Sequence, residues 1–242
     1  MANPVFTIGI PIYPHATLLD ITGPYQVFAT PFWKTDVKLV AAGTAPVPTD
    51  EGARLVPDVV FEECPPLDLL FVPGGPGQYD MMLDDRYIAF LRRQGQSAKY
   101  VSSVCTGALL LAVAGLLDGY KATTHWAAIT CLQLFPDIQV MPGYPRFVVD
   151  RKGDQTRITG GGVSSGIDEA LEIAGIIAGP DAARNIQLEV QYAPKPPFSD
   201  GDPLSASGSV YDSVWAALKP LERKRLEQIE HILSGQAAHH DR

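Results

Sequence analysis

One stretch sets the architecture of this chain: Tyr100-Val101-Ser102-Ser103-Val104-Cys105-Thr106-Gly107-Ala108-Leu109-Leu110-Leu111, a strand that runs into a helix through one cysteine and small residues. This order is typical of a nucleophile elbow, in which a sharp turn lifts one side chain above the sheet. The N–H groups at the start of the following helix would favour the thiolate of Cys105. A small apolar residue packed at a strand end fits the same letters. Both interpretations stay open on this segment alone.

Alternating strands and helices predict the fold class. Strands are predicted at Phe6–Ile12, Val37–Ala42, Leu67–Val72, just before Cys105, and at Phe147–Asp150 and Thr156–Thr159. Helices are predicted at Gly23–Ala29, Arg86–Gln96, just after Cys105, and at Trp126–Leu134, Gly166–Ala178 and Pro180–Gln191, and a hairpin at Pro46–Val60. This alternation indicates a three-layer α/β sandwich with a mostly parallel central sheet, of the flavodoxin-like kind.

The chain is predicted to form one unit. Residues 1–192 would make up the α/β domain, and residues 193–242 a proline-rich connector and a final helix, about Val210 to Leu233, packed on it. With 242 residues, of which 46% are hydrophobic, the chain is long enough to bury a full core. Cys105, the Pro73–Gly77 loop and the Gly160–Gly162 loop all follow predicted strands. In a parallel sheet they would meet at one rim, where ligands bind.

Charge and cysteine content exclude several classes of protein. The net charge of −8 argues against nucleic acid or an anionic membrane as a partner, and no apolar run reaches the ~20 residues of a spanning helix. Three cysteines without CxxC spacing fit neither a disulfide framework nor a zinc site, and no His, Cys and carboxylate residues show metal-ligand spacing. We therefore expect a soluble cytoplasmic protein with reduced thiols, no metal and no cofactor.

Asp20 and two glycine loops are candidates for the chemistry of the site. Asp20 lies among aliphatic residues, where a carboxylate needs a partner or a raised pKa, and this favours function over helix capping. Gly74-Gly75 and Gly160-Gly161-Gly162 could turn N–H groups toward an anion, although tight turning explains them equally well. His125 is the candidate base for a Cys–His pair, and a packed or capping histidine fits that position as well.

Four segments together resemble the ThiJ/PfpI superfamily, which has the class I glutamine-amidotransferase-like fold. They are LLDITGPYQVF at 18–28, FVPGGPG at 71–77, SVCTGALLLAVAGLLDG at 103–119 and ATTHW at 122–126. The resemblance covers about Val5 to Gln191. Within the superfamily it is greatest to the enzymes that hydrate isocyanides, through Asp20, ITGGGVSSGID at 158–168 and QLEVQYAPKPPF at 187–198.

The resemblance implies a mechanism. Cys105 would attack an isocyanide to form a thioimidate, and Asp20, oriented by Thr106, would act as acid and then as base toward water, releasing an N-substituted formamide. Backbone contacts to the reacting atoms would come from Gly74, Gly75, Thr106, Gly162 and Val163. His125 would play a supporting part at most.

Three alternatives remain beside this hypothesis, the weakest of which is a redox sensor that uses Cys105, since no second cysteine is placed obviously to resolve it. Another cysteine enzyme of the superfamily, acting on an α-oxoaldehyde or an amide, would need His125. The ligand-sensing domain of an AraC-type regulator is similar at SVCTG and ATTHW, but one long helix after residue 200 does not supply two helix-turn-helix units. The resemblance and the extended connector at 192–209 also predict a homodimer.

Overall fold

A seven-stranded sheet forms the centre of the structure, a computed structural model that describes residues 5–240, with side chains as far as residue 235. Its strands stand in the order β10-β11-β7-β6-β1-β2-β5. Their bounds are β1 Phe6–Pro11, β2 Thr35–Ala41, β5 Val59–Val60, β6 Leu69–Val72, β7 Tyr100–Ser103, β10 Phe147–Lys152 and β11 Gln155–Gly160. Every neighbouring pair is parallel except β10 and β11. The predicted mostly parallel sheet is confirmed.

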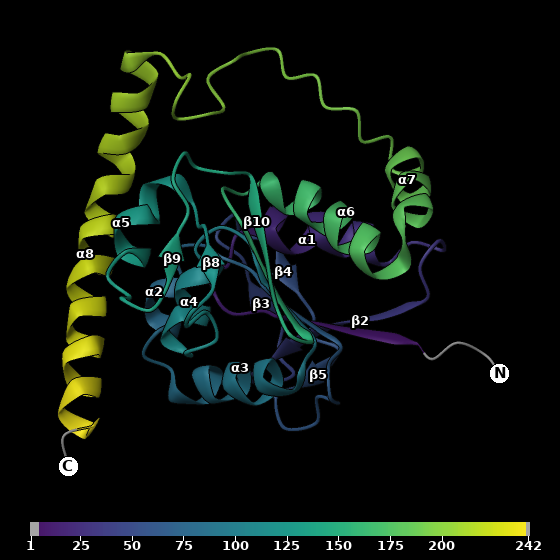
Figure 1. Cartoon of the computed structure of the whole chain (residues 1–242), viewed down its shortest axis with the longest axis horizontal. Helices are drawn as coiled ribbons and strands as arrows, with labels where there is room; N and C mark the ends of the chain where they lie inside the picture. The colour runs from purple at the N-terminus through teal and green to yellow at the C-terminus, as the bar shows by residue number, and fades with distance from the viewer. Residues whose placement is uncertain (1–4, 241–242) are drawn as a thin grey trace.

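Helices cover both faces of this sheet, which makes the predicted three-layer sandwich (Figure 1). On one face lie α1 (Leu18–Phe28) and α6 (Ser165–Ala178), which pack against each other, with α7 (Pro180–Glu189) beside α6. The other face carries α3 (Asp85–Ser97) and α4 (Gly107–Val113). Shorter elements are α2 (Gln78–Met81), the 3-10 helix η1 (Trp126–Ala128) and α5 (Ile129–Leu132).

Two small sheets lie outside the central one. β3 (Val47–Pro48) pairs antiparallel with β4 (Arg54–Leu55), which is the predicted hairpin, while Val59–Val60 leaves it to join the edge of the central sheet as β5. β8 (Lys121–Ala122) pairs parallel with β9 (Gln139–Val140). The helix predicted at Trp126–Leu134 is divided into η1 and α5.

Helix α1 begins earlier than predicted. A proline favours the first turn of a helix, so the sequence indicated a start at Gly23, but α1 begins at Leu18 and contains Pro24. Pro24 forfeits only its own hydrogen bond, to the carbonyl four residues earlier. Buried side chains such as Ile21 and Val27 hold the helix against the core, and such packing supplies most of a helix's stability.

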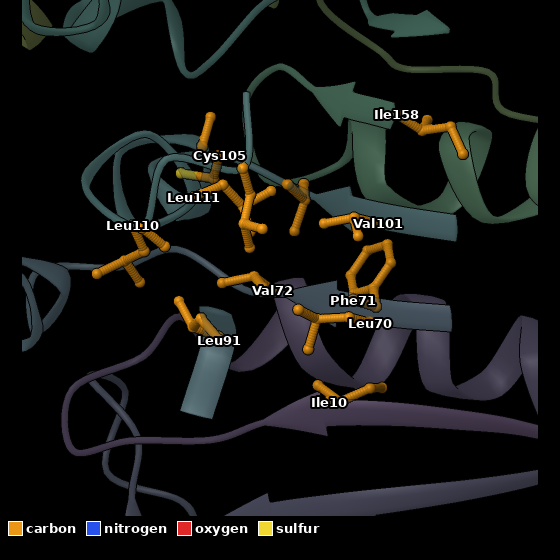
Figure 2. Close-up of a cluster of buried hydrophobic side chains, with 14 of the residues drawn as sticks. Ile10, Leu70, Phe71, Val72, Leu91, Val101, Cys105, Leu110, Leu111 and Ile158 are labelled. Carbon is orange, nitrogen blue, oxygen red and sulfur yellow. The ribbon is translucent and has the colours of Figure 1, made fainter. Parts of the chain in front are cut away.

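The core is built from aliphatic side chains of adjacent strands. Figure 2 shows them in neighbouring positions, with Ile10 of β1, Leu70 of β6, Val101 of β7 and Ile158 of β11, all fully buried. Parallel strands covered on both faces read as continuous apolar runs, as β6 does. Cys105 lies at the end of the strand that carries Val101.

The last helix, α8 (Gly208–His240), runs along the side of the domain at which the parallel strands end (Figure 1). It contacts η1 and α5. The connector at 192–207 that leads to it is exposed along most of its length. Within the part of the chain that the structure describes, no helix is both long enough and apolar enough to cross a bilayer.

Candidate active site

Cys105 occupies a sharp turn between β7 and α4. Its φ of 56° lies in the left-handed region, which residues other than glycine rarely adopt and which is found at nucleophile elbows. Hydrogen bonds fix this conformation on both sides: the Cys105 N–H donates to the Gly161 carbonyl at 2.8 Å, and the Thr124 hydroxyl donates to the Cys105 carbonyl at 2.7 Å. The turn is therefore locked to the segment that follows β11.

The loop after β6 packs on this elbow backbone to backbone. A Cβ added at Gly74 would lie 2.5 Å from the Thr106 nitrogen and 2.9 Å from the Cys105 Cβ. One added at Gly107 would lie 2.9 Å from the Pro73 carbonyl oxygen. Only glycine fits at either position, which explains these glycines by close approach of the two chain segments.

Asp20 is brought to the same place by α1. Its side chain is fully buried, and Oδ2 accepts a hydrogen bond from the Gly74 N–H at 2.9 Å. Oδ1 has no hydrogen-bond partner among the described residues. Burial raises the pKa of Asp20 to about 7, against the opposing effects of the Gly74 N–H and the neighbouring Cys105 side chain. Near neutral pH this carboxyl can both give and take a proton.

Thr106 connects Cys105 to the glycine loop. Its Oγ1 accepts from the Gly75 N–H at 3.0 Å, and the same hydroxyl donates to the Gly75 carbonyl at 3.3 Å. Burial raises the pKa of the Cys105 thiol far above its usual value, and the charge of Asp20 raises it further. Hydrogen bonds from the Thr106 backbone and side chain lower this thiol's pKa, because they stabilise the thiolate.

The backbone groups named from the sequence lie here in a different arrangement. The N–H groups of Gly74 and Gly75 hold Asp20 and Thr106, and the Thr106 hydroxyl contacts Gly75 rather than Asp20. After β11 it is Gly161 that hydrogen bonds to the elbow, two residues before Val163. Gly162 lies against a histidine ring instead.

That histidine is His125, which caps η1. Its Nδ1 accepts a hydrogen bond from the Ala127 N–H at 3.2 Å, and a Cβ at Gly162 would lie 3.1 Å from its Cδ2. Burial lowers the pKa of His125 to about 4, and the positive charge of Arg225 lowers it as well. A neutral imidazole with one nitrogen engaged by the backbone is a weak base at neutral pH.

Arg225 is a site residue that sequence reasoning missed. It comes from α8, is 7% exposed, and donates from Nε to Gln78 Oε1 at 2.9 Å and from Nη2 to the Gly75 carbonyl at 3.3 Å. Val214, an apolar residue of the same helix, is exposed, so apolar residues alone do not mark the face of α8 that packs on the domain. No sequence signal separates Arg225 from the solvated charges around it.

A cavity of about 350 Å³ lies beside the site, at the ends of β1 and β2. Its lining includes Tyr13, Val47, Phe61 and Tyr87, and it shares Tyr13 with the site, since the Tyr13 hydroxyl donates to the Pro73 carbonyl at 2.9 Å. Among the residues that the structure describes, no three His, Cys, Asp or Glu side chains gather as metal ligands would.

Comparison with known proteins adds to this geometry. The profile of the DJ-1/PfpI family matches residues 7–173. The isonitrile hydratase of Pseudomonas putida is 41% identical over 92% of this chain and 94% of its own. The crystal structure of a ThiJ/PfpI family protein from Pseudomonas syringae superposes with a TM-score of 0.86 at 34% identity, covering 93% of this chain and 91% of that one.

Regulators share a shorter part of the sequence. The HTH-type transcriptional regulator GbdR of Pseudomonas aeruginosa is 31% identical over 52% of this chain, a region that makes up 32% of the regulator. The likeness to the regulator is therefore confined to one part of each protein.

Proposed function

The chain belongs to the DJ-1/PfpI family, and we propose that it is an isonitrile hydratase, which adds water to an isocyanide to give an N-substituted formamide. The relative of that name in Pseudomonas putida extends over nearly the whole chain. One observation in the site carries the proposal: a carboxyl with a pKa of about 7 stands beside a thiol at a nucleophile elbow. Such a pair supplies a nucleophile together with a group that can act as acid and base.

The first half of the proposed reaction starts from protonated Asp20 and the thiolate of Cys105, whose sulfur forms a bond to the terminal carbon of the isocyanide. Asp20 supplies the proton, so the product is a thioimidate with one hydrogen on that carbon, and Asp20 is left ionised. The Thr106 N–H, which lowers the pKa of the thiol against the effect of burial, stabilises the charge on the sulfur that attacks.

In the second half, ionised Asp20 takes a proton from water as its oxygen adds to the same carbon. Asp20 passes this proton to the nitrogen, the carbon–sulfur bond breaks, and Cys105 leaves as a thiolate. The hydroxyl proton of the adduct returns to Asp20, so the formamide departs from a site restored to its starting state. Burial serves both halves, because it keeps the pKa of Asp20 near neutrality.

The proposal is tested by incubating the purified protein with a simple alkyl isocyanide and measuring the N-alkyl formamide. We expect turnover by the parent protein and none by Cys105→Ala or Cys105→Ser, since a hydroxyl lacks the acidity of a thiol. Mass spectrometry of the quenched parent protein should find one substrate mass on Cys105. Formamide formation at the parent rate in either variant would contradict the proposal.

The proposal also covers the cellular compartment and the class of substrate. All three cysteines, Cys64, Cys105 and Cys131, are free, and free thiols persist in a reducing compartment, so we place the enzyme in the cytoplasm. The substrate is a small molecule, in keeping with a site that exposes 5% of Cys105.

A further inference from the structure

We propose that Arg225 of α8 is a positioning residue for the reaction, which holds the Gly75 peptide in place and offers its positive charge to the Cys105 sulfur when the thiolate forms. Its part in turnover rests on the proposed function. Its effect on the thiol does not. Figure 1 shows α8 beside α2, the helix that begins at Gln78, and Arg225 reaches from one to the other.

Hydrogen bonding gives the first argument. The Gly75 carbonyl accepts from two side chains that come from different elements, Thr106 on the elbow at 3.3 Å and Arg225 on α8 at 3.3 Å. The Gly75 N–H is held by Thr106 at 3.0 Å. Because the preceding N–H, that of Gly74, positions Asp20, the guanidinium fixes the loop on which the acid depends.

Charge gives the second argument. Arg225 is buried, and among the residues that the structure describes no carboxylate forms an ion pair with it. It donates to a neutral amide and a neutral carbonyl only. A buried cation without a direct ion-pair partner is costly, and an anion that forms nearby relieves that cost. A thiolate at Cys105 is such an anion, and the charge of Arg225 lowers this thiol's pKa against the effect of burial.

Among the described residues, none of the other titratable groups forms an ion pair with Arg225. The titratable groups coupled electrostatically to Arg225 or Cys105 are Tyr13, Asp20, His125, Cys131 and Glu222, and Glu51 in turn acts on Asp20. Burial raises the pKa of Tyr13 and Cys131 and keeps both neutral. The charge of Glu222 raises the pKa of Arg225 without an ion pair between the two, and its carboxylate accepts a hydrogen bond from the Thr130 hydroxyl at 2.7 Å.

The experiment measures the alkylation rate of Cys105 by iodoacetamide from pH 6 to 10, with the modified peptide quantified by mass spectrometry. Three variants are compared with the parent: Arg225→Met, Arg225→Lys and Arg223→Met. Arg223 lies on the same helix with 77% of its side chain exposed, so it is the matched control for loss of a charge. Folding of each variant is checked by circular dichroism.

For Arg225→Met we expect the alkylation profile to move upward by about one pH unit, which makes the rate at pH 8 about tenfold lower. Arg225→Lys keeps the positive charge and loses the planar set of guanidinium donors. Its alkylation profile should match that of the parent protein, while its turnover of isocyanide should fall. Arg223→Met should match the parent in both.

An unchanged alkylation profile in folded Arg225→Met overturns the proposal. Should Arg225→Met fail to fold, Arg225→Lys decides, and a profile shifted upward despite the retained charge overturns it. A shifted profile in a protein that turns over no isocyanide would support the part of Arg225 and refute the proposed function, so the two failures are distinct.

Discussion

At the scale of single residues, Asp20 and Cys105 titrate as a pair. Burial raises the pKa of both, the charge of Asp20 raises the pKa of the thiol further, and the Cys105 side chain lowers the pKa of Asp20. The thioimidate step needs one proton and one negative charge between them. Below pH 7 the pair holds two protons, and it loses the first as pH rises through about 7. We therefore expect kcat/KM for isocyanide to rise through about pH 7. A rate that falls there, measured from pH 5 to 9 after subtraction of uncatalysed hydrolysis, would contradict this order of titration.

The substitution Asp20→Asn should lower the activity and raise the stability of the protein. Asparagine can accept from the Gly74 N–H but carries no proton, so kcat should fall by ~10²–10⁴. The folded pKa of Asp20, about 7, lies above its unfolded value, so its ionisation opposes folding increasingly from about pH 4 to 7 and by a constant amount above. Thermal unfolding should show the variant gaining stability over the parent at pH 8 and gaining less at pH 5. An equal difference at both pH values would mean that the carboxyl is not held at a raised pKa.

His125→Ala should cost far less activity than Asp20→Asn. The imidazole caps η1 and is neutral at pH 7, so its loss removes one hydrogen bond and some packing against Gly162. We expect kcat for isocyanide to fall by less than ~10-fold, below the range for a removed acid–base group. Methylglyoxal consumption is measured on the same samples. Complete inactivity of His125→Ala, with methylglyoxal turnover by the parent, would favour the α-oxoaldehyde alternative.

Sequence reasoning could identify Asp20 and Cys105 because their surroundings are unusual for their type. A carboxyl among aliphatic residues needs a partner or a raised pKa, and a cysteine between a strand and a helix occupies the position of a nucleophile. Arg225 has no such unusual surroundings in the sequence, since an arginine in a helix rich in Glu, Lys and Arg is ordinarily solvated. Its burial depends on how α8 docks, which no local pattern encodes.

At the scale of elements, the elbow depends on how closely α4 approaches the end of β6. Alanine at Gly107 would place its Cβ against the carbonyl oxygens of Val72 and Pro73, both backbone atoms that cannot rotate away. We expect Gly107→Ala to lower the free energy of unfolding by about 1–3 kcal/mol in a denaturant titration. Gly43→Ala is the control, because a Cβ there meets nothing within 4 Å. Equal stability of the two variants would contradict the close approach.

The boundaries of α1 show where local rules are insufficient. The proline rule places a helix start at Gly23, whereas tertiary packing begins the helix at Leu18 and so carries Asp20 on a rigid element. The alternation of apolar runs, by contrast, predicted the strands of the central sheet, since burial on both faces leaves a strong pattern.

At the scale of the whole molecule, we expect a homodimer in which the connector contacts the second copy. Phe198 and Leu204 lie on the connector with 80% and 67% exposure, and a partner that covers them would remove this apolar surface from water. Sedimentation should give about twice 26.1 kDa for the parent and a monomer for Phe198→Ser with Leu204→Ser. Val56→Ser, at a site elsewhere that is 64% exposed, should stay dimeric. A parent that sediments as a monomer would contradict the expectation.

The docking of α8 also has a consequence for the time at which the site becomes competent. Arg225 is separated from Gly75 by 150 positions, and the thiol at the elbow is made long before the helix that carries the guanidinium. At the ribosomal rate of ~5–20 residues per second, that interval lasts on the order of 10 s. During it, Cys105 lacks the charge that lowers its pKa, because α8 has not yet been made. The charge that Arg225 offers to the Cys105 sulfur is therefore available only after synthesis has passed residue 225.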